Sequence, residues 1–416
     1  MEEKKIDSLK RELKLKQFQF NSIYEFSSSL YSSFDIDNIM RIYFSTLMGQ
    51  MGISKTFFFD SENKLFRKRG FKLSEDKLEV LFKEIKKTDD EIFYLKVDDL
   101  PEQLVNLKSI LLLKEIHYLV NISESKKRKI ILGLGYKFNR IKLGSEDIEF
   151  SFFISKFASS AIDNAFMIGK IIESKRIEYE INIARDIQLS LLPQKIPELE
   201  NFEISVIYEP INEVGGDYYD ILKEKNGITP VLIADVEGKG LSAALLAASS
   251  QAVFRSLNEL YFFEPAKFIS KANSLIYDLT RGNRFITLFW MLIDDAKKSV
   301  TYVNAGHVEP LLISKSKVVS LSKGGFLTGF VGNAKYEKET LQLKKGDIIV
   351  TFTDGVPEVE NPDEREFGQE AIIDFIKKNK KLSAYKISEK LFKTINNFSH
   401  NKKFRDDFTL IIIKVK

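Results

Sequence analysis

The sequence contains no cysteine and only three histidines among its 416 residues. Without cysteine, the chain has no disulfides, no thiolate metal sites, no cysteine nucleophile and no cysteine-linked chromophore. The histidines, His117, His307 and His400, lie too far apart in the chain for a paired-histidine zinc motif. Cysteine chemistry and paired-histidine zinc sites are therefore excluded.

The sequence also lacks a long apolar run and a strong charge of either sign. No stretch reaches the ~18 apolar residues of a membrane span, and the first residues are charged rather than signal-like. The formal net charge of +4 gives no reason to expect nucleic acid as the main partner. We therefore expect a cytoplasmic protein with neither a membrane nor a nucleic-acid partner. With 44% apolar residues, the chain can form two or three domains.

Acidic residues stand at the edges of strand-like segments in the C-terminal half. Asp217 follows a Gly-Gly pair, and Asp235 closes a short apolar run whose length suits a buried strand. Asp354 and the pair Asp406-Asp407 stand at the edges of two further apolar runs. Oxygen ligands gathered from strand ends are the kind that Mg²⁺ or Mn²⁺ prefers. These positions therefore predict a site for divalent cations.

The first half of the chain is predicted to contain a leading helix over 1–20, a compact α+β domain over 21–167 and a linker helix over 168–192. The leading helix has a loose apolar stripe, which suits a coiled coil or a cap on its own domain. The linker helix ends before Pro193. It serves either to pair two chains and pass a signal onward, or as a spacer lying against the following domain. Its apolar stripe consists of Ile177, Ile181, Ala184, Gln188 and Leu191.

Two stretches of the 21–167 region resemble a GAF domain, a small α+β sensor module. They are SLYSSFDIDNIM (29–40) near its start and KIILGLGYKFNRIKLGSEDIEFSFFISKFASSAIDNAF (129–166) at its end. The resemblance implies a module that binds a small-molecule ligand or acts only as a dimerisation surface, and no motif identifies the ligand. His117 stands alone between apolar neighbours, so we expect a packed residue rather than a haem ligand.

From residue 193 onward the pattern favours strands. Apolar residues alternate over 202–208, as expected for a strand with one buried face, and at least five more strand-like segments follow. Helical segments lie near 241–260, 265–280 and 383–398. Many strands with too few helices for βαβ alternation predict an α+β domain over 193–416, in which two packed antiparallel sheets are flanked by helices.

Five short motifs of this region occur in the order and spacing of one family. They are GGDYYD (215–220), ADVEGKGLSAAL (234–245), VNAGH (303–307), FTDGVPEV (352–359) and RDDFTL (405–410). Together they resemble the SpoIIE/RsbU-type phosphatases of the PPM superfamily, which are metal-dependent serine/threonine phosphatases. ARDIQLSLLP (184–193) also resembles the regulatory helix that leads into this domain. The resemblance implies an α-β-β-α sandwich that binds two Mn²⁺ or Mg²⁺ ions.

The resemblance also implies which residues hold the ions. Asp235 is the bridging ligand, Asp217 bridges or approaches the first ion, and Asp354 and Asp406 hold the second; these four aspartates are the implied catalytic residues. The role of Asp407 is open between a ligand, a contact through water and a turn residue, and the same is true of Asp220. The full set of implied metal ligands is Asp217, Asp235, the backbone carbonyl of Val236, Asp354, Asp406 and Asp407.

The sequence departs from the family pattern at one position of the second motif. Many relatives have Asp-Val-Ser-Gly-His-Gly where this chain has DVEGKG at 235–240. Lys239 removes a proton donor that titrates near neutral pH and adds a cation that attracts phosphate. His307 is expected to be held by backbone hydrogen bonds rather than to act in catalysis. No general acid and no phosphate-clamping arginine can be assigned.

Taken together, the motifs predict a metal-dependent phosphatase that the N-terminal sensor regulates through the 168–192 helix. The resemblance implies phosphoserine or phosphothreonine on a small regulatory protein of the anti-anti-sigma (STAS) kind as the substrate. Two alternatives stay open: a catalytically silent scaffold that binds a partner, and an enzyme for a small phosphorylated metabolite. A homodimer through the leading and linker helices is a further expectation.

Overall fold

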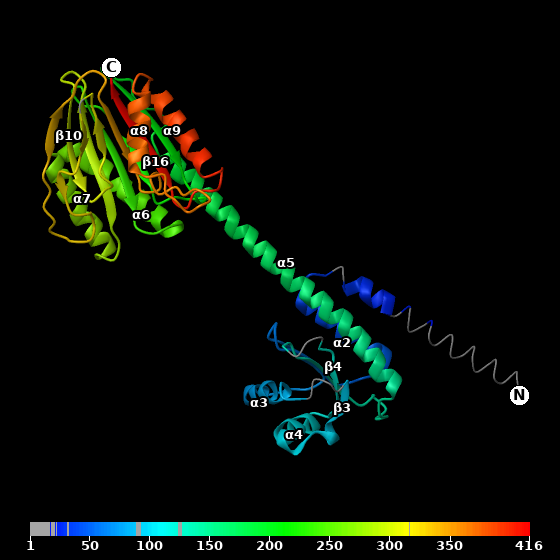
Figure 1. The fold of residues 1–416 in the computed structure, drawn as a ribbon. Helices are drawn as coiled ribbons and strands as arrows, with labels where there is room; N and C mark the ends of the chain where they lie inside the picture. Colours follow the sequence, from blue (N-terminus) through cyan, green and yellow to red (C-terminus); the bar gives the residue numbers. More distant parts are fainter. Residues whose placement is uncertain are drawn as a thin grey trace, which may run out of the picture. The chain divides into compact units, whose positions relative to one another are not determined.

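The computed structural model describes residues 17, 21, 23–30, 33–88, 93–123, 127–315 and 317–416. The chain divides into two compact units, Met1–Arg176 and Ile177–Lys416, and Figure 1 colours them along the sequence. Apart from Gln17, the predicted leading helix lies outside the described residues. The predicted domain boundaries after residues 20, 167 and 192 stay predictions.

The first unit is built on one antiparallel sheet with the strand order β2-β1-β5-β4-β3. Its strands are β1 (Thr56–Asp60), β2 (Leu65–Arg69), β3 (Tyr94–Lys96), β4 (Ile116–Asn121) and β5 (Ile130–Gly135). Its helices are α2 (Ile36–Met51), α3 (Glu75–Ile85), α4 (Val105–Leu113) and the first part of α5 (Ser145–Leu191), with 3-10 turns at Val97–Asp99 and Glu102–Leu104. The predicted α+β class of this region is confirmed.

Helices cover both faces of this sheet, which explains the three consecutive phenylalanines of β1. Phe58 packs in the core formed with α2 and α5, whereas Phe57 and Phe59 pack in the core formed with α3 and α4. Every residue of β1 is therefore buried. α2 begins where the Asp35 side chain accepts hydrogen bonds from backbone N–H groups of its first turn, and it ends at Gly52, whose φ of 65° is left-handed.

α5 runs without a break through the end of the predicted sensor domain and the predicted linker. No proline interrupts it, and a Cβ at Gly169 would meet nothing within 4 Å, so this glycine forms no close contact. Two segments predicted separately thus form one continuous helix. None of the helices in the described ranges combines the length and apolar character needed to cross a membrane.

The second unit contains two sheets. The first has the order β13-β10-β9-β8-β7, with β14 paired to β10, and the second has the order β12-β11-β15-β16-β6. Their strands are β6 (Phe202–Glu209), β7 (Tyr218–Ile221), β8 (Ile228–Val236), β9 (Ile286–Asp294), β10 (Ser299–Ala305), β11 (Leu311–Ile313), β12 (Val318–Ser320), β13 (Gly324–Gly325), β14 (Glu339–Gln342), β15 (Ile348–Phe352) and β16 (Phe408–Val415). The helices are α6 (Leu241–Tyr261), α7 (Pro265–Thr280), α8 (Gln369–Asn379) and α9 (Ala384–Phe398).

These elements form four layers, as Figure 1 shows. α6 and α7 cover the first sheet, α8 and α9 cover the second, and the two sheets face each other. The core between the sheets includes Ile233 and Met291 from one sheet and Ile411 and Ile413 from the other. The predicted sandwich of two sheets flanked by helices is confirmed for this unit.

β6 differs from the prediction of a strand with one buried face. Ile204 and Val206 pack against the core between the sheets, but Ile207 packs on the opposite side, in the core that includes α9. The hydroxyls of Ser205 and Ser388 of α9 also share a hydrogen bond of 2.7 Å. The prediction is wrong for the second face, because α9 covers it.

Candidate metal centre

Asp217 is buried just before β7, where the loop meets two other strands. Its carboxylate accepts hydrogen bonds from the hydroxyls of Thr353, at the end of β15 (2.7 Å), and Thr409 of β16. Burial raises the pKa of Asp217 well above its usual range, the charge of Asp235 adds to the rise, and the two threonine hydrogen bonds act in the opposite direction. Asp217 thus joins three segments that are distant in the sequence.

Asp235 and Asp354 stand at the ends of β8 and β15, where their charges interact. Burial raises the pKa of Asp235 to about 7, and three further carboxylates add to the rise: Asp354, Asp406 and Asp407. Burial and the charge of Asp406 also raise the pKa of Asp354. Burial and the charges of neighbouring carboxylates together disfavour the ionised forms of these aspartates.

Asp407 holds the glycine loop that precedes Asp217. Its Oδ1 accepts the backbone N–H of Ile211 (2.8 Å), and its Oδ2 accepts that of Gly216 (2.6 Å). A Cβ at Gly215 would lie 2.7 Å from Asp407 Oδ2, so only glycine fits without a shift. The carboxylate therefore positions this loop, and its predicted role as a metal ligand stays a prediction.

Asp406, the neighbour of Asp407, has a cationic partner instead. Lys239 Nζ lies 2.6 Å from Asp406 Oδ2 and donates to the backbone carbonyl of Arg405 (2.9 Å). The hydrogen bond to Asp406 raises the pKa of Lys239, so the lysine is charged at neutral pH. The residue that replaces the histidine of the family motif thus offsets part of the negative charge of the site.

The carboxylates have the chemistry of a hard-cation site. Within the described ranges, no three acidic or histidine side chains are arranged to hold a metal ion. The donors at hand are nevertheless all oxygen atoms, which suits Mg²⁺ and Mn²⁺. Burial raises the pKa values of Asp217 and Asp235, so a bound cation would stabilise their ionised forms. The residues therefore fit a divalent ion by their chemistry, and the assignment of individual ligands stays a prediction.

Two histidines that the sequence singles out have structural surroundings. His307 donates its backbone N–H to Asn304 Oδ1 (2.8 Å), and its Nδ1 shares a hydrogen bond with the Thr287 hydroxyl (2.9 Å). Burial lowers the pKa of His307 to about 4, so its ring is neutral at neutral pH. In the first unit, His117 stacks on Tyr136 with ring centroids 3.7 Å apart. Both surroundings agree with the packed roles expected from the sequence.

The last turn of α5 is hydrogen-bonded to the same glycine loop. Gln188 and Gly215 form reciprocal bonds: Nε2 donates to the Gly215 carbonyl (2.7 Å), and Oε1 accepts its N–H (3.1 Å). The Leu191 carbonyl accepts hydrogen bonds from Arg255 (3.0 Å) and Gln251, both on α6. This end of the predicted apolar stripe therefore lies against the domain that follows, as one of the two predicted roles requires.

Other polar partners of the site were not recognised from the sequence. Thr353 directly precedes Asp354, and Thr409 follows Asp407 by two residues, so their places within the acidic motifs are the signal that could have identified them. Asp220, left open above, is buried and pairs with Arg255 Nε (2.8 Å), while the Tyr218 hydroxyl donates to it. Asp220 thus ties β7 to α6.

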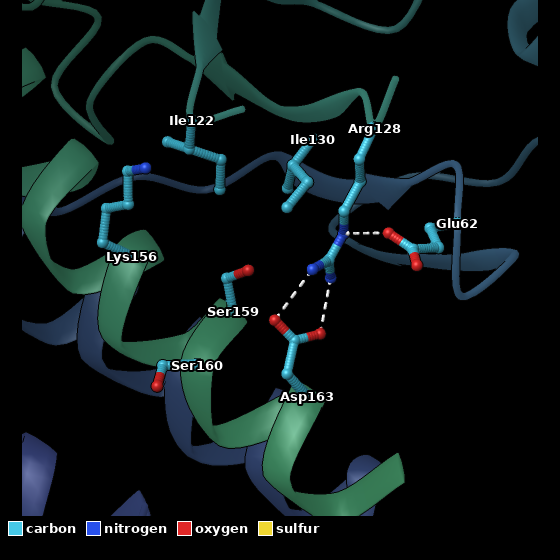
Figure 2. Close-up of a pocket in the computed structure, with 8 residues that line it drawn as sticks. All are labelled: Glu62, Ile122, Arg128, Ile130, Lys156, Ser159, Ser160 and Asp163. Carbon is cyan, nitrogen blue, oxygen red and sulfur yellow. Dashed lines mark hydrogen bonds and ion pairs between the residues drawn. The ribbon is translucent and has the colours of Figure 1, made fainter. Parts of the chain in front are cut away.

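The first unit contains a polar pocket of about 390 Å³ beside α5 (Figure 2). Arg128 lines it and forms ion pairs with Asp60 (2.5 Å), Asp163 (2.6 Å) and Glu62 (3.6 Å). Burial alone would raise the pKa of Asp60, but the hydrogen bonds and charge of Arg128 outweigh it and lower this pKa. The pocket is lined by Glu62, Ile122, Arg128, Ile130, Lys156, Ser159, Ser160 and Asp163.

Comparison with known proteins identifies relatives of the second unit. The family model described as Stage II sporulation protein E (SpoIIE) matches residues 225–416. Phosphoserine phosphatase RsbU of Bacillus subtilis (strain 168) is 31% identical over 251 residues, which cover 58% of this chain and 72% of that protein. Phosphoserine phosphatase RsbP of the same organism is 27% identical over 186 residues, which cover 42% of this chain and 45% of that protein.

A solved structure has the same C-terminal fold. The SiaA-PP2C domain of Pseudomonas aeruginosa aligns with a TM-score of 0.54 at 18% identity, and the match covers 59% of this chain and 99% of that chain. This level of identity supports a shared fold, whereas the relation to RsbU extends over most of that protein at higher identity. The chain therefore belongs to the SpoIIE/RsbU family of protein serine/threonine phosphatases.

Proposed function

We propose that this protein hydrolyses phosphoserine or phosphothreonine on a small regulatory protein of the STAS kind, with the help of two Mn²⁺ or Mg²⁺ ions. The observation that carries the proposal is the electrostatic coupling of Asp235 to Asp217 and to Asp354: burial raises the pKa of each of these carboxyls, and the charge of a neighbouring aspartate adds to each rise. Both relatives described above are named as phosphoserine phosphatases.

The residues that would hold the ions are Asp217, Asp235, the backbone carbonyl of Val236, Asp354, Asp406 and, in its open role, Asp407. Bound ions of this kind lower the pKa of a water molecule and neutralise charge on the attacked phosphate. The chain itself supplies orientation. Thr353 and Thr409 hold the carboxylate of Asp217, and Asp407 holds the loop before it.

A substrate screen of the purified full-length chain with Mn²⁺ tests this proposal. We expect a serine-phosphorylated STAS-type protein to be hydrolysed with a kcat/KM at least ~100-fold above that of phosphorylated metabolites, because a protein makes contacts outside the metal centre. A scaffold would bind the phosphorylated protein saturably and release no phosphate. An enzyme for metabolites would hydrolyse the metabolites faster than the phosphorylated protein. Binding without phosphate release, or faster hydrolysis of metabolites, would reject the proposed substrate.

We further propose that the first unit is a GAF-like sensor that acts on the second through α5. Support comes from its five-stranded antiparallel sheet with helices on both faces and from the polar pocket around Arg128, a candidate site for a small ligand (Figure 2). α5 leads from Ser159 and Asp163 at this pocket to Gln188 at the glycine loop. A shift of the helix can therefore reach the site.

Removal of residues 1–167 is expected to change kcat/KM for an aryl phosphate by at least about fivefold, the lower range of allosteric coupling. The physical reason is that the rest of α5 loses the domain that biases its position. Initial rates of the 168–416 chain and the full-length chain at equal Mn²⁺ concentration measure the effect. Equal rates would identify the helix as a passive spacer.

Gln188→Ala is expected to lower turnover about tenfold, because both hydrogen bonds that hold Gly215 are lost and small misplacements near a reacting centre are costly. Steady-state kinetics on the full-length protein measure the change. Gln194→Ala is the matched control, because the exposed Gln194 side chain donates to the nearby Leu189 and Leu192 carbonyls. Equal kinetics of the two variants would remove Gln188 from the route between the units.

We also propose that two chains pair in parallel through α5. Ile172, Tyr179, Ile183 and Ile187 follow one another at steps of seven and four residues, so they share a face of the helix, and all four are exposed. An exposed apolar face of this kind favours a second helix of the same sequence. Sedimentation of the purified chain should detect a dimer, and a monomer at all concentrations would contradict this pairing.

A further inference from the structure

An exposed aromatic surface lies next to the loop that follows Asp235. Phe326 and Phe330 are each 51% exposed, and Val331 is 45% exposed. The ring centroids of Phe326 and Phe330 lie 5.9 Å apart, and the Phe330 ring lies 6.3 Å from that of Phe285. We name these four residues together with Arg284 the aromatic rim.

The aromatic rim is bonded to the loop that carries the acidic site. Arg284 Nη1 donates to the backbone carbonyl of Glu237 (3.2 Å), and the Phe285 carbonyl accepts the Glu237 N–H (3.1 Å). A Cβ at Gly238 would lie 2.6 Å from Arg284 Nη1, so the guanidinium lies directly over this glycine. Glu237 is two residues from Asp235, which places the rim at the edge of the proposed metal centre.

Hydrogen bonds to the rest of the domain hold the segment 328–331, which carries Phe330 and Val331. Asn273 is fully buried; its Oδ1 accepts the Gly329 N–H (2.8 Å), and its Nδ2 donates to the Val331 carbonyl (2.8 Å). Thr328 and Ile286 exchange two backbone hydrogen bonds of 2.9 Å. The loop therefore holds large apolar side chains in solvent at defined positions, and such fixed apolar surface marks an interaction site.

The rim contains one cation, Arg284, whose surroundings differ from those of the nearby cations Lys239 and Arg405. Lys239 is paired with Asp406, and Arg405 is paired with Glu360 at 2.5 Å. In the part of the chain that the structure describes, the one bond of the Arg284 guanidinium is to a backbone carbonyl, and no carboxylate neutralises it. An exposed guanidinium with unused N–H donors suits the oxygens of a phosphate group.

We propose that the aromatic rim docks the phosphorylated segment of a protein substrate. Arg284 contacts the phosphate, and Phe326 and Phe330 receive an apolar side chain close to the phosphoserine in sequence. This inference rests on the proposed phosphatase function and adds a selection rule, namely an apolar residue flanking the phosphorylated one. The cation complements the phosphate, and the apolar surface complements the apolar flanking residue. A small phosphorylated metabolite has no flanking residue that could cover the apolar surface.

Two synthetic phosphoserine peptides test the rule on the full-length protein with Mn²⁺. They differ only in the flanking residues, which are leucine in one and serine in the other. We expect the wild type to prefer the leucine peptide about tenfold in kcat/KM, and the Phe326→Ser/Phe330→Ser variant to lower this ratio to about one. Because the ratio is taken within each variant, a general change in turnover cancels.

Conservative and distant variants serve as controls for the ratio. Phe330→Leu keeps an apolar side chain and should keep the preference. Phe263→Ser removes a phenylalanine that is 54% exposed but lies outside the rim, and it should also keep the preference. Arg284→Ala should lower kcat/KM for both peptides about tenfold through KM, with partial recovery in Arg284→Lys, while Arg281→Ala should match the wild type.

Two results would overturn the docking proposal alone. One is hydrolysis of both peptides at equal rates by the wild type, and the other is an unchanged ratio in the double variant. If the ratio is unchanged and the double variant is also a monomer in sedimentation where the wild type is a dimer, the surface would be assigned to a contact between two copies of the chain. If neither peptide nor an aryl phosphate releases phosphate, the proposed function itself is rejected, and the docking proposal with it.

Discussion

The Asp354→Asn variant is expected to lose manganese-dependent hydrolysis of an aryl phosphate, with a fall in kcat of at least about a thousandfold. Asp354 follows β15, where burial and the charge of Asp406 raise its pKa. In the proposed function this carboxylate holds an ion, and a neutral amide is a much weaker ligand for a hard cation. Initial rates at saturating Mn²⁺ measure the loss.

The same variant separates loss of a ligand from loss of the fold. A raised pKa means that the folded state disfavours the ionised form of Asp354, so an uncharged amide should leave the metal-free protein at least as stable as the wild type. Thermal unfolding in chelator checks this. Asp363→Asn, at an exposed position of the following loop, should retain full activity. Turnover of Asp354→Asn at the wild-type rate would contradict the assignment.

Arg128→Ala is expected to destabilise the first unit by about 3–5 kcal/mol, the usual cost of removing one partner of a buried ion pair. The guanidinium bridges Asp163 and the fully buried carboxylate of Asp60. Without it, burial would raise the pKa of Asp60 and leave a buried charge without a cation. Urea unfolding of the full-length protein, followed by hydrogen exchange of β1 and β5 amides, measures the loss.

Three comparisons test this explanation. Asp60→Asn/Arg128→Ala should recover part of the loss, because no uncompensated charge remains. Arg67→Ala removes an exposed pair with Asp37 (2.8 Å) and should cost no more than about 1 kcal/mol. Because the pKa of Asp60 is lowered in the folded state, the ion pair stabilises the protein above the ordinary pKa of about 4, and its contribution should fade in acid. An Arg128→Ala loss no larger than that of Arg67→Ala would contradict the bridging role.

The fold of the second unit was largely predictable because most of its long strands coincide with clear apolar runs in the sequence. β8, β9, β15 and β16 are buried along most of their length, and each corresponds to such a run. α8 was missed, although Ile372 and Ile376 reach the core at a four-residue step. It is short, and its N-cap position is Gly368, which makes no side-chain cap, so the sequence carries no clear start signal.

The sequence names the acidic residues of the candidate site, but it does not reveal the partners that the structure gives them. Asp406 and Asp407 are neighbours with different surroundings: one pairs with Lys239, and the other accepts backbone N–H groups that include that of Gly216. These partners come from distant segments, so no local pattern distinguishes the two aspartates. No local pattern predicts the exposure of Phe330 either, because that exposure depends on the tertiary contacts that hold its loop.

The central claim is that the chain needs two bound metal ions to hydrolyse a phosphate ester. Phosphate release from an aryl phosphate by the full-length chain, measured as a function of free Mn²⁺ concentration, tests it most directly. We expect no release in chelator and a rise in rate that follows the binding of two Mn²⁺ ions per chain, measured in parallel by calorimetry. Full turnover in the presence of chelator would contradict the account. So would a folded chain that releases no phosphate at any concentration of Mn²⁺ or Mg²⁺.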